Sequence, residues 1–235
     1  MKFPIFYYIF PFICLLVAVF SQYSGLDIYL TQFFYDPLHH LWTYQNSWLT
    51  QTVLHDGAAD VIKLIFMSII VFFCTTFLLD KGRRYRRAAG YVIVASLTGI
   101  IIIAVLKEVT HLYTPWDLEQ FGGRFPNIRL FDPVASHLPV GHAFPAGHAS
   151  GGYALLSIYF AARYYQSRYS LRFLYAALAA GLILGIDQQI RGAHMLSHDL
   201  STLAICWLSC LFWAGILVQS DMAVETTSRI EGLRE

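Results

Sequence analysis

Residues 89–108 read AGYVIVASLTGIIIIAVLKE, and the only charged residues in this segment are Lys107 and Glu108 at its end. A helix needs about 20 predominantly apolar residues to cross the hydrocarbon core of a bilayer. The segment therefore predicts a transmembrane helix with a lysine at one end. Five further segments have similar length and composition, and they lie at about 4–21, 58–79, 148–166, 171–190 and 198–219.

The composition of the whole chain agrees with these six helices. Of its 235 residues, 57% are hydrophobic and only 13% are charged, whereas soluble domains have about 45–50% apolar and about 25% charged residues. We therefore predict an all-α integral membrane protein with six transmembrane helices. The lipid bilayer is its expected partner. The net charge of +1 provides no global field for nucleic acid, and no obligatory protein partner is expected.

The basic residues predict the orientation of the helices. Five of them lie in the loop 80–88 and three in the turn 163–172, and Lys2, Arg229 and Arg234 lie near the termini. Since cytoplasmic loops carry the excess of Lys and Arg, we expect both termini in the cytoplasm and the two long connections, 22–57 and 109–147, on the outer side. All nine histidines then fall in the outer half.

The predicted organisation has three parts. Residues 1–57 form the first transmembrane helix, expected to be retained rather than cleaved as a signal peptide, and an aromatic outer loop that lies along the interface and shields an opening between helices. Residues 58–219 form a core of five helices. Residues 220–235 form a cytoplasmic tail. The four cysteines lie in apolar runs, which favours packing over a disulfide or a metal site.

Three polar clusters fall at the predicted outer ends of helices, with the sequences KEVTHLYTP (107–115), GHAFPAGHASGG (141–152) and QQIRGAHMLSHDLS (188–201). Taken alone, Lys107 suits a snorkelling interfacial lysine, the second cluster a simple Pro-Gly helix entry, and the third a polar interface turn. Taken together, they offer two fixed cations, the unpaired N–H groups of a helix start and two or three histidines. This is the equipment for phosphoryl transfer without a metal or other cofactor.

The clusters resemble the three motifs of the type-2 phosphatidic acid phosphatase superfamily, which shares its core with vanadium haloperoxidases. The family pattern is K-x6-R-P, then P-S-G-H, then S-R-x5-H-x3-D. The resemblance covers about residues 58–219. The corresponding stretches of this chain are Lys107-x6-Thr114-Pro115, then Pro145-Ala146-Gly147-His148, then the segment from Arg191 through His194 and His198 to Asp199.

The chain also departs from this pattern. Thr114 replaces the arginine of the first motif, for which Arg124 or Arg129 in the outer loop is a candidate substitute, and Ala146 replaces the serine of the second. In the third motif the arginine position, six before His194, holds Gln188, and Arg191 is closer. A histidine, His198, stands four after His194, where the family has its carboxylate, and Asp199 follows it.

The resemblance implies the following roles. His194 is the nucleophile that attacks phosphorus, and His148 is the general acid and base. His198 or Asp199 orients His194, with His198 as an alternative nucleophile. The expected substrate-binding residues are Lys107, Thr114, Pro145, Ala146, Gly147, Arg191 and Arg124.

The favoured function is that of a lipid phosphatase that hydrolyses a phosphate monoester or a pyrophosphate through a phosphohistidine. We expect it in a bacterial inner membrane, with its active site on the periplasmic side. Lipid A of lipopolysaccharide, undecaprenyl pyrophosphate, phosphatidylglycerol phosphate and phosphatidate all qualify, and the large loop 109–147 favours the first two. A lipid phosphotransferase with the same phosphohistidine is an alternative, and a family member without activity is another. An alternative of a different class is a His-rich metal-binding or transport membrane protein.

Overall fold

The computed structural model describes residues 3–231, and it describes their side chains as far as residue 217. It is 72% helical, with one two-stranded antiparallel hairpin that pairs Tyr35 with Trp42. The elements in chain order are α1 (Phe6–Ser24), α2 (Leu26–Thr31), η1 (Gln32–Phe34), β1 (Tyr35–Asp36), β2 (Leu41–Trp42), η2 (Trp48–Gly57), α3 (Ala58–Leu78), η3 (Asp80–Tyr85), α4 (Arg86–Val109), η4 (Pro115–Asp117), η5 (Glu119–Phe121), α5 (Gly147–Ala154), α6 (Leu156–Tyr164), α7 (Ser170–Ile190) and α8 (Leu196–Glu231).

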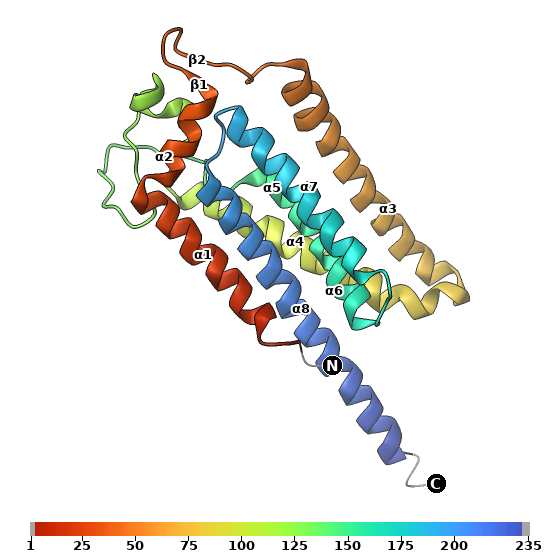
Figure 1. The fold of residues 1–235 in the computed structure, drawn as a ribbon. Coiled ribbons are helices and arrows are strands. Elements are labelled where there is room, and N and C mark those ends of the chain that lie inside the picture. The colour runs from red at the N-terminus through yellow and green to blue at the C-terminus, as the bar shows by residue number, and fades with distance from the viewer. Residues whose placement is uncertain (1–2, 232–235) are drawn as a thin grey trace.

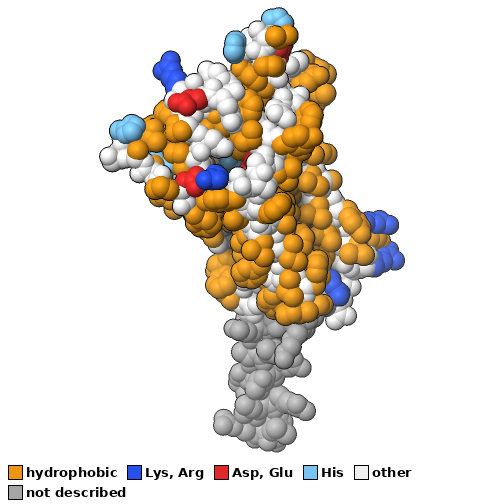
Figure 2. All heavy atoms as spheres, turned by 60° about the vertical axis from the view of Figure 1, so that its left-hand side comes forward, with side chains coloured by type: hydrophobic (Ala, Val, Ile, Leu, Met, Phe, Trp, Pro, Cys, Tyr) orange, Lys and Arg blue, Asp and Glu red, His pale blue; other side chains and the backbone are white. Residues whose placement is uncertain are grey.

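Five segments within the described residues are long and apolar enough to cross a membrane: Phe6–Ser24, Trp48–Leu78, Asp80–Val109, Ser170–Ile190 and Leu196–Leu217. They run side by side in one bundle (Figure 1). Apolar side chains cover much of the outside of this bundle (Figure 2), as expected of a surface in contact with lipid. The prediction of an all-α membrane protein is therefore supported, and five of the six expected helices are long enough to span a bilayer.

The expected fourth span, 148–166, differs from the prediction because it is two shorter helices, α5 and α6. The break lies at Leu155, whose amide donates to the carbonyl of Gly152 at 3.1 Å in a tightened turn. Glycine explains why α5 nevertheless packs closely on α7. A Cβ at Gly152 would lie 2.4 Å from the amide nitrogen of Gly181, and a Cβ at Gly181 would lie 2.1 Å from the Tyr153 ring. Small residues allow such helix contacts in membranes.

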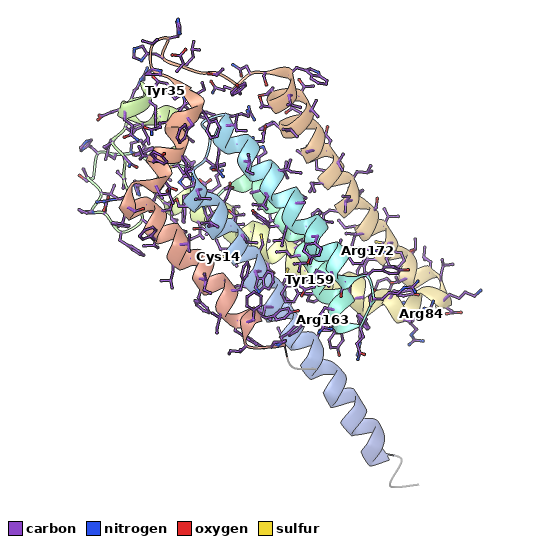
Figure 3. All side chains as sticks on the ribbon, viewed as in Figure 1. Cys14, Tyr35, Arg84, Tyr159, Arg163 and Arg172 are labelled. Carbon is purple, nitrogen blue, oxygen red and sulfur yellow. The ribbon has the colours of Figure 1, made fainter. Side chains whose placement is uncertain are left out.

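The core between α1, α6 and α8 is aromatic. Tyr7 lies against Phe160 and Trp207, its hydroxyl bonds to that of Tyr159, and the indole N–H of Trp207 donates to the Tyr7 carbonyl at 2.9 Å. Tyr159 and Cys14 point into this part of the bundle in Figure 3. These contacts join the first and last helices, so the two ends of the chain share one bundle.

The ends of the bundle differ in character. Arg84, Arg163 and Arg172 lie toward one end, and Tyr35, in the segment that joins α1 to α3, lies toward the other (Figure 3). The hairpin, α2 and the long loop after α4 form a cap over the Tyr35 end (Figure 1). The expected outer loop is more ordered than predicted, since residues 48–57 form a π-helix that continues directly into α3.

Candidate active site

Two hydrogen bonds join the turn before α5 to the first turns of α8. The amide of Ala146 donates to the carbonyl of His198 at 3.4 Å, and the hydroxyl of Thr202 donates to the carbonyl of Ala146 at 3.0 Å. Ala146 is the residue before the helix and no side chain caps it. The first N–H groups of a helix have no intrahelical partner, so the second and third predicted clusters meet at an unpaired, positive helix end.

Lys107 brings a charge to the same turn. It lies in the last turn of α4 and is partly buried. A Cβ at Gly147 would stand 3.4 Å from its Nζ, so the ammonium group lies beside the start of α5. A lysine that only snorkels would extend toward water instead. The first predicted cluster therefore joins the other two.

His194 and His198 form a buried pair at the junction of α7 and α8. Their Nδ1 atoms are 3.4 Å apart, and the two residues are 4% and 1% exposed. Burial lowers the pKa of His194 well below its ordinary value, and the neighbouring His198 and Lys107 lower it further. At neutral pH His194 is therefore an uncharged imidazole, which is the nucleophilic form.

Arg191 is held by the segment that precedes α3. Its Nε donates to the carbonyl of Gln45 at 3.0 Å, and its Nη2 donates to the side-chain oxygen of Gln51. The residue is 7% exposed, yet its Nη1 is buried without a hydrogen-bond partner. A buried cationic donor without a partner is costly, and an anion in the adjacent site would supply the missing acceptor. Arg191 and Lys107 both act electrostatically on His148.

His148 lies in the first turn of α5 and stacks against His55 from η2. The ring centroids are 4.2 Å apart and the rings are inclined by 38°. The Nδ1 of His55 is 2.8 Å from a carboxylate oxygen of Asp56. His148 also acts electrostatically on His194, which places the two predicted catalytic histidines in one charged cluster. His55 is a site residue that the sequence reasoning did not single out.

The sequence leaves two candidates, Asp199 and His198, for the residue that orients His194. Asp199 turns toward α7, where it accepts from the side chain of Gln189, and a Cβ at Gly185 would lie 2.4 Å from its Oδ2. His198 is the one that contacts His194. The reason is that α8 begins only at Leu196. His194 therefore lies in the turn before the helix, and this turn, not helical spacing, determines that His194 contacts His198.

Contacts on both sides hold the loop that carries His194. Gly192 has a φ of +80°, and a Cβ there would lie 2.4 Å from the Trp42 ring, while its carbonyl accepts from the Trp116 amide at 3.1 Å. On the other side, Asp27 of α2 accepts from the Ser197 amide at 3.0 Å. A carboxylate at a helix start is favourable, and burial raises the pKa of Asp27.

Two predicted binding residues have other surroundings. The hydroxyl of Thr114 donates to the carboxylate of Asp117. Arg124 is exposed in the loop after η5, and the structure as described gives its side chain no contact with the cluster. Arg129, the other candidate substitute, pairs with Asp132 at 2.8 Å. Among residues 3–217, no three His, Cys, Asp or Glu side chains are grouped so that they could hold a metal ion.

Comparison with known proteins gives no further guidance, because no family model, no curated protein and no solved structure matches this chain.

Proposed function

We propose that this chain is an integral-membrane lipid phosphatase that works through a phosphohistidine on His194. The observation that carries the proposal has two parts. Lys107 lies beside the uncapped start of α5 and acts electrostatically on the buried His194, as His148 does. Arg191, whose Nη1 has no partner, acts in turn on His148. Lys107, the start of α5 and the free Nη1 of Arg191 each favour a phosphate anion. Preorganised donors of this kind supply most of the catalysis in phosphoryl transfer.

The reaction has two steps. In the first, Nε2 of His194 forms a bond to phosphorus as the bond to the lipid oxygen breaks, and His148 gives a proton to that oxygen. Burial, and then His55, Lys107 and Arg191, lower the pKa of His148 to about 4, so His148 carries this proton only once the bound phosphate anion has raised its pKa. In the second, neutral His148 takes a proton from water, the oxygen of that water bonds to phosphorus, and the bond to Nε2 breaks. Lys107 and Arg191 hold the phosphoryl oxygens, and the pair contact with His198 keeps His194 in position. The sum is ester plus water giving alcohol plus phosphate.

The favoured substrates are phosphate monoesters and pyrophosphates of bacterial lipids, reached from the outer leaflet. The concentration of arginines at the opposite end of the bundle (Figure 3) supports a periplasmic site and cytoplasmic termini. The cap built by residues 22–57 and the loop 109–147 supports a large headgroup, such as lipid A or a polyprenyl pyrophosphate. The bacterial inner membrane is the proposed location.

A panel of these lipid phosphates in detergent tests the proposal, with chelator present and released phosphate as the readout. His148→Ala removes the general acid and base and is expected to abolish release. His137→Ala is the matched control, because His137 is an exposed histidine in the loop that precedes α5. If no lipid phosphate is hydrolysed, or if both variants behave alike, the proposal is wrong. Transfer of labelled phosphate to a second lipid, without release, would identify a phosphotransferase instead.

A further inference from the structure

A large apolar cavity lies at the end of the bundle opposite the candidate active site. Its volume is about 770 Å³, within the range of ligand sites, and it lies between α3, α4, α6 and α7. Its walls include Ile69 and Phe72 of α3, Val92 of α4 and Ile158 of α6. We call this cavity the α3 groove. It takes no part in the proposed chemistry, which involves the other ends of α4 and α7.

The α3 groove continues along α3 toward the middle of the bundle. A second cavity of about 410 Å³ shares Ile69, Phe72 and Ile158 with it and extends to Leu64. Since a helix rises 1.5 Å per residue, the five-residue step from Ile69 to Leu64 adds roughly 7.5 Å of length. The combined space is therefore apolar, elongated along α3 and open at the surface, so an acyl chain can lie along it.

The mouth of the α3 groove is cationic. Arg84 and Tyr85 line it, and the guanidinium of Arg84 lies 4.5 Å above the Tyr85 ring. Lys81, Arg83, Arg86 and Arg87 lie in the same short stretch. The basic side chains of this end stand out against an apolar surface in Figure 2. An apolar groove with a cation at one end is complementary to an amphiphile with an anionic head.

We propose that the α3 groove binds one anionic phospholipid of the surrounding bilayer, with an acyl chain along α3 and the headgroup phosphate at Arg84. Basic pockets between transmembrane helices recognise anionic headgroups in this way. The position of α3 gives such a lipid a structural role. Only 6% of the most apolar part of the span Trp48–Leu78 is buried in the protein, so other helices hold α3 weakly.

The lipid would also act on the candidate active site, because α3 continues from η2, which carries His55 against His148. A lipid that wedges α3 against α4 and α6 fixes the end of the segment that holds His55. The binding itself does not depend on the proposed catalysis, and the two claims can fail separately.

The test measures lipid that stays bound when the protein is purified from membranes containing phosphatidylglycerol and phosphatidylcholine, by native mass spectrometry. The wild type is expected to retain one phosphatidylglycerol in preference to phosphatidylcholine. Arg84→Gln should lower this preference about fivefold, the equivalent of the ~1 kcal/mol contributed by a basic residue near an anionic headgroup. Arg83→Gln is the matched control, since it removes the same charge from the same turn without lining the groove, and it should change the preference by less than twofold.

A second variant tests the apolar part. Ala88 lines the groove on α4, and Ala88→Trp fills the space beside it, so both lipids should be lost while the helical circular dichroism stays unchanged. The proposal is overturned if the wild type shows no preference for phosphatidylglycerol, if Arg83→Gln and Arg84→Gln have equal effects, or if a folded Ala88→Trp protein keeps its lipid.

Discussion

Replacing Arg191 with alanine separates a catalytic arginine from a structural one. In the structure Arg191 uses Nε and Nη2 to hold the Gln45 carbonyl and the Gln51 side chain, and its buried Nη1 has no partner. In our account Nη1 donates to a phosphoryl oxygen whose charge grows in the transition state. The substitution therefore removes one preorganised donor from the reaction and two hydrogen bonds from the fold.

The two losses have different sizes. Loss of one donor to a developing oxyanion costs about 2.7–4 kcal/mol, so kcat/KM should fall by about 10²–10³-fold. The stability loss arises because the Gln45 carbonyl and the Gln51 amide lose a charged donor, and about 1–3 kcal/mol is expected for each group left unpaired in a buried position. Gln51→Leu removes only the second anchor, so it should lower stability with a much smaller effect on rate.

Phosphate release from the best lipid of the panel gives kcat/KM, and the thermal unfolding midpoint in the same detergent gives stability. The reasoning predicts that kcat/KM of Arg191→Ala falls far below that of Gln51→Leu, while Arg191→Ala loses only one further hydrogen bond, about 1–3 kcal/mol of stability. If Arg191→Ala keeps kcat/KM within about threefold of the wild type and only its midpoint falls, Arg191 is a structural residue and contributes no transition-state binding.

Three further results are expected. His55→Ala removes the ring that stacks on the general acid and base, so kcat should fall about tenfold with little change in the unfolding midpoint; an unchanged kcat would show that the stacking is incidental. Because burial holds the pKa of His194 below its unfolded value, the unfolded chain binds the extra proton first, and the midpoint should fall as the pH is lowered through about 6.5; His194→Gln should flatten this slope, and an equally steep slope would refute it. Gly192→Ala must adopt a φ of +80° against Trp42 and should lose more than about 1 kcal/mol. Gly215→Ala lies inside α8, where a Cβ meets nothing within 4 Å, and it should keep or raise the midpoint because alanine favours a helix more than glycine does; equal midpoints of the two variants would contradict the role given to Gly192.

The long helices were predictable because one property, the length of an apolar run, determines them. The expected span 171–190 is α7, Ser170–Ile190, and the expected span 58–79 is α3, Ala58–Leu78. The break at Leu155 was not predictable, since the apolar run continues through it and only the packing of α5 on α7 requires two helices. The helix over residues 48–57 was also missed, because WLTQTVLHDG has neither a long apolar run nor a strong helical periodicity.

The candidate site was predictable where its residues lie in short motifs and not where they arrive from a distance. The three clusters were recognisable from the spacing of Lys107, His148 and His194, and the structure places them in one region. Nothing local marks His55 as a neighbour of His148, since 93 positions separate them in the chain. The partner of His194 depends on the residue at which α8 begins, and helix starts are uncertain by one or two residues in any sequence-based prediction.

Covalent capture of the phosphoryl group tests the central claim most directly. The protein is incubated briefly with a lipid substrate whose phosphate is labelled, and it is then denatured in alkali. The labelled peptide is sequenced by mass spectrometry. We predict label on the imidazole of His194, none in His194→Ala, and the wild-type amount in His137→Ala. Label on His198 or His148 instead, or steady hydrolysis without any labelled histidine, would contradict the account.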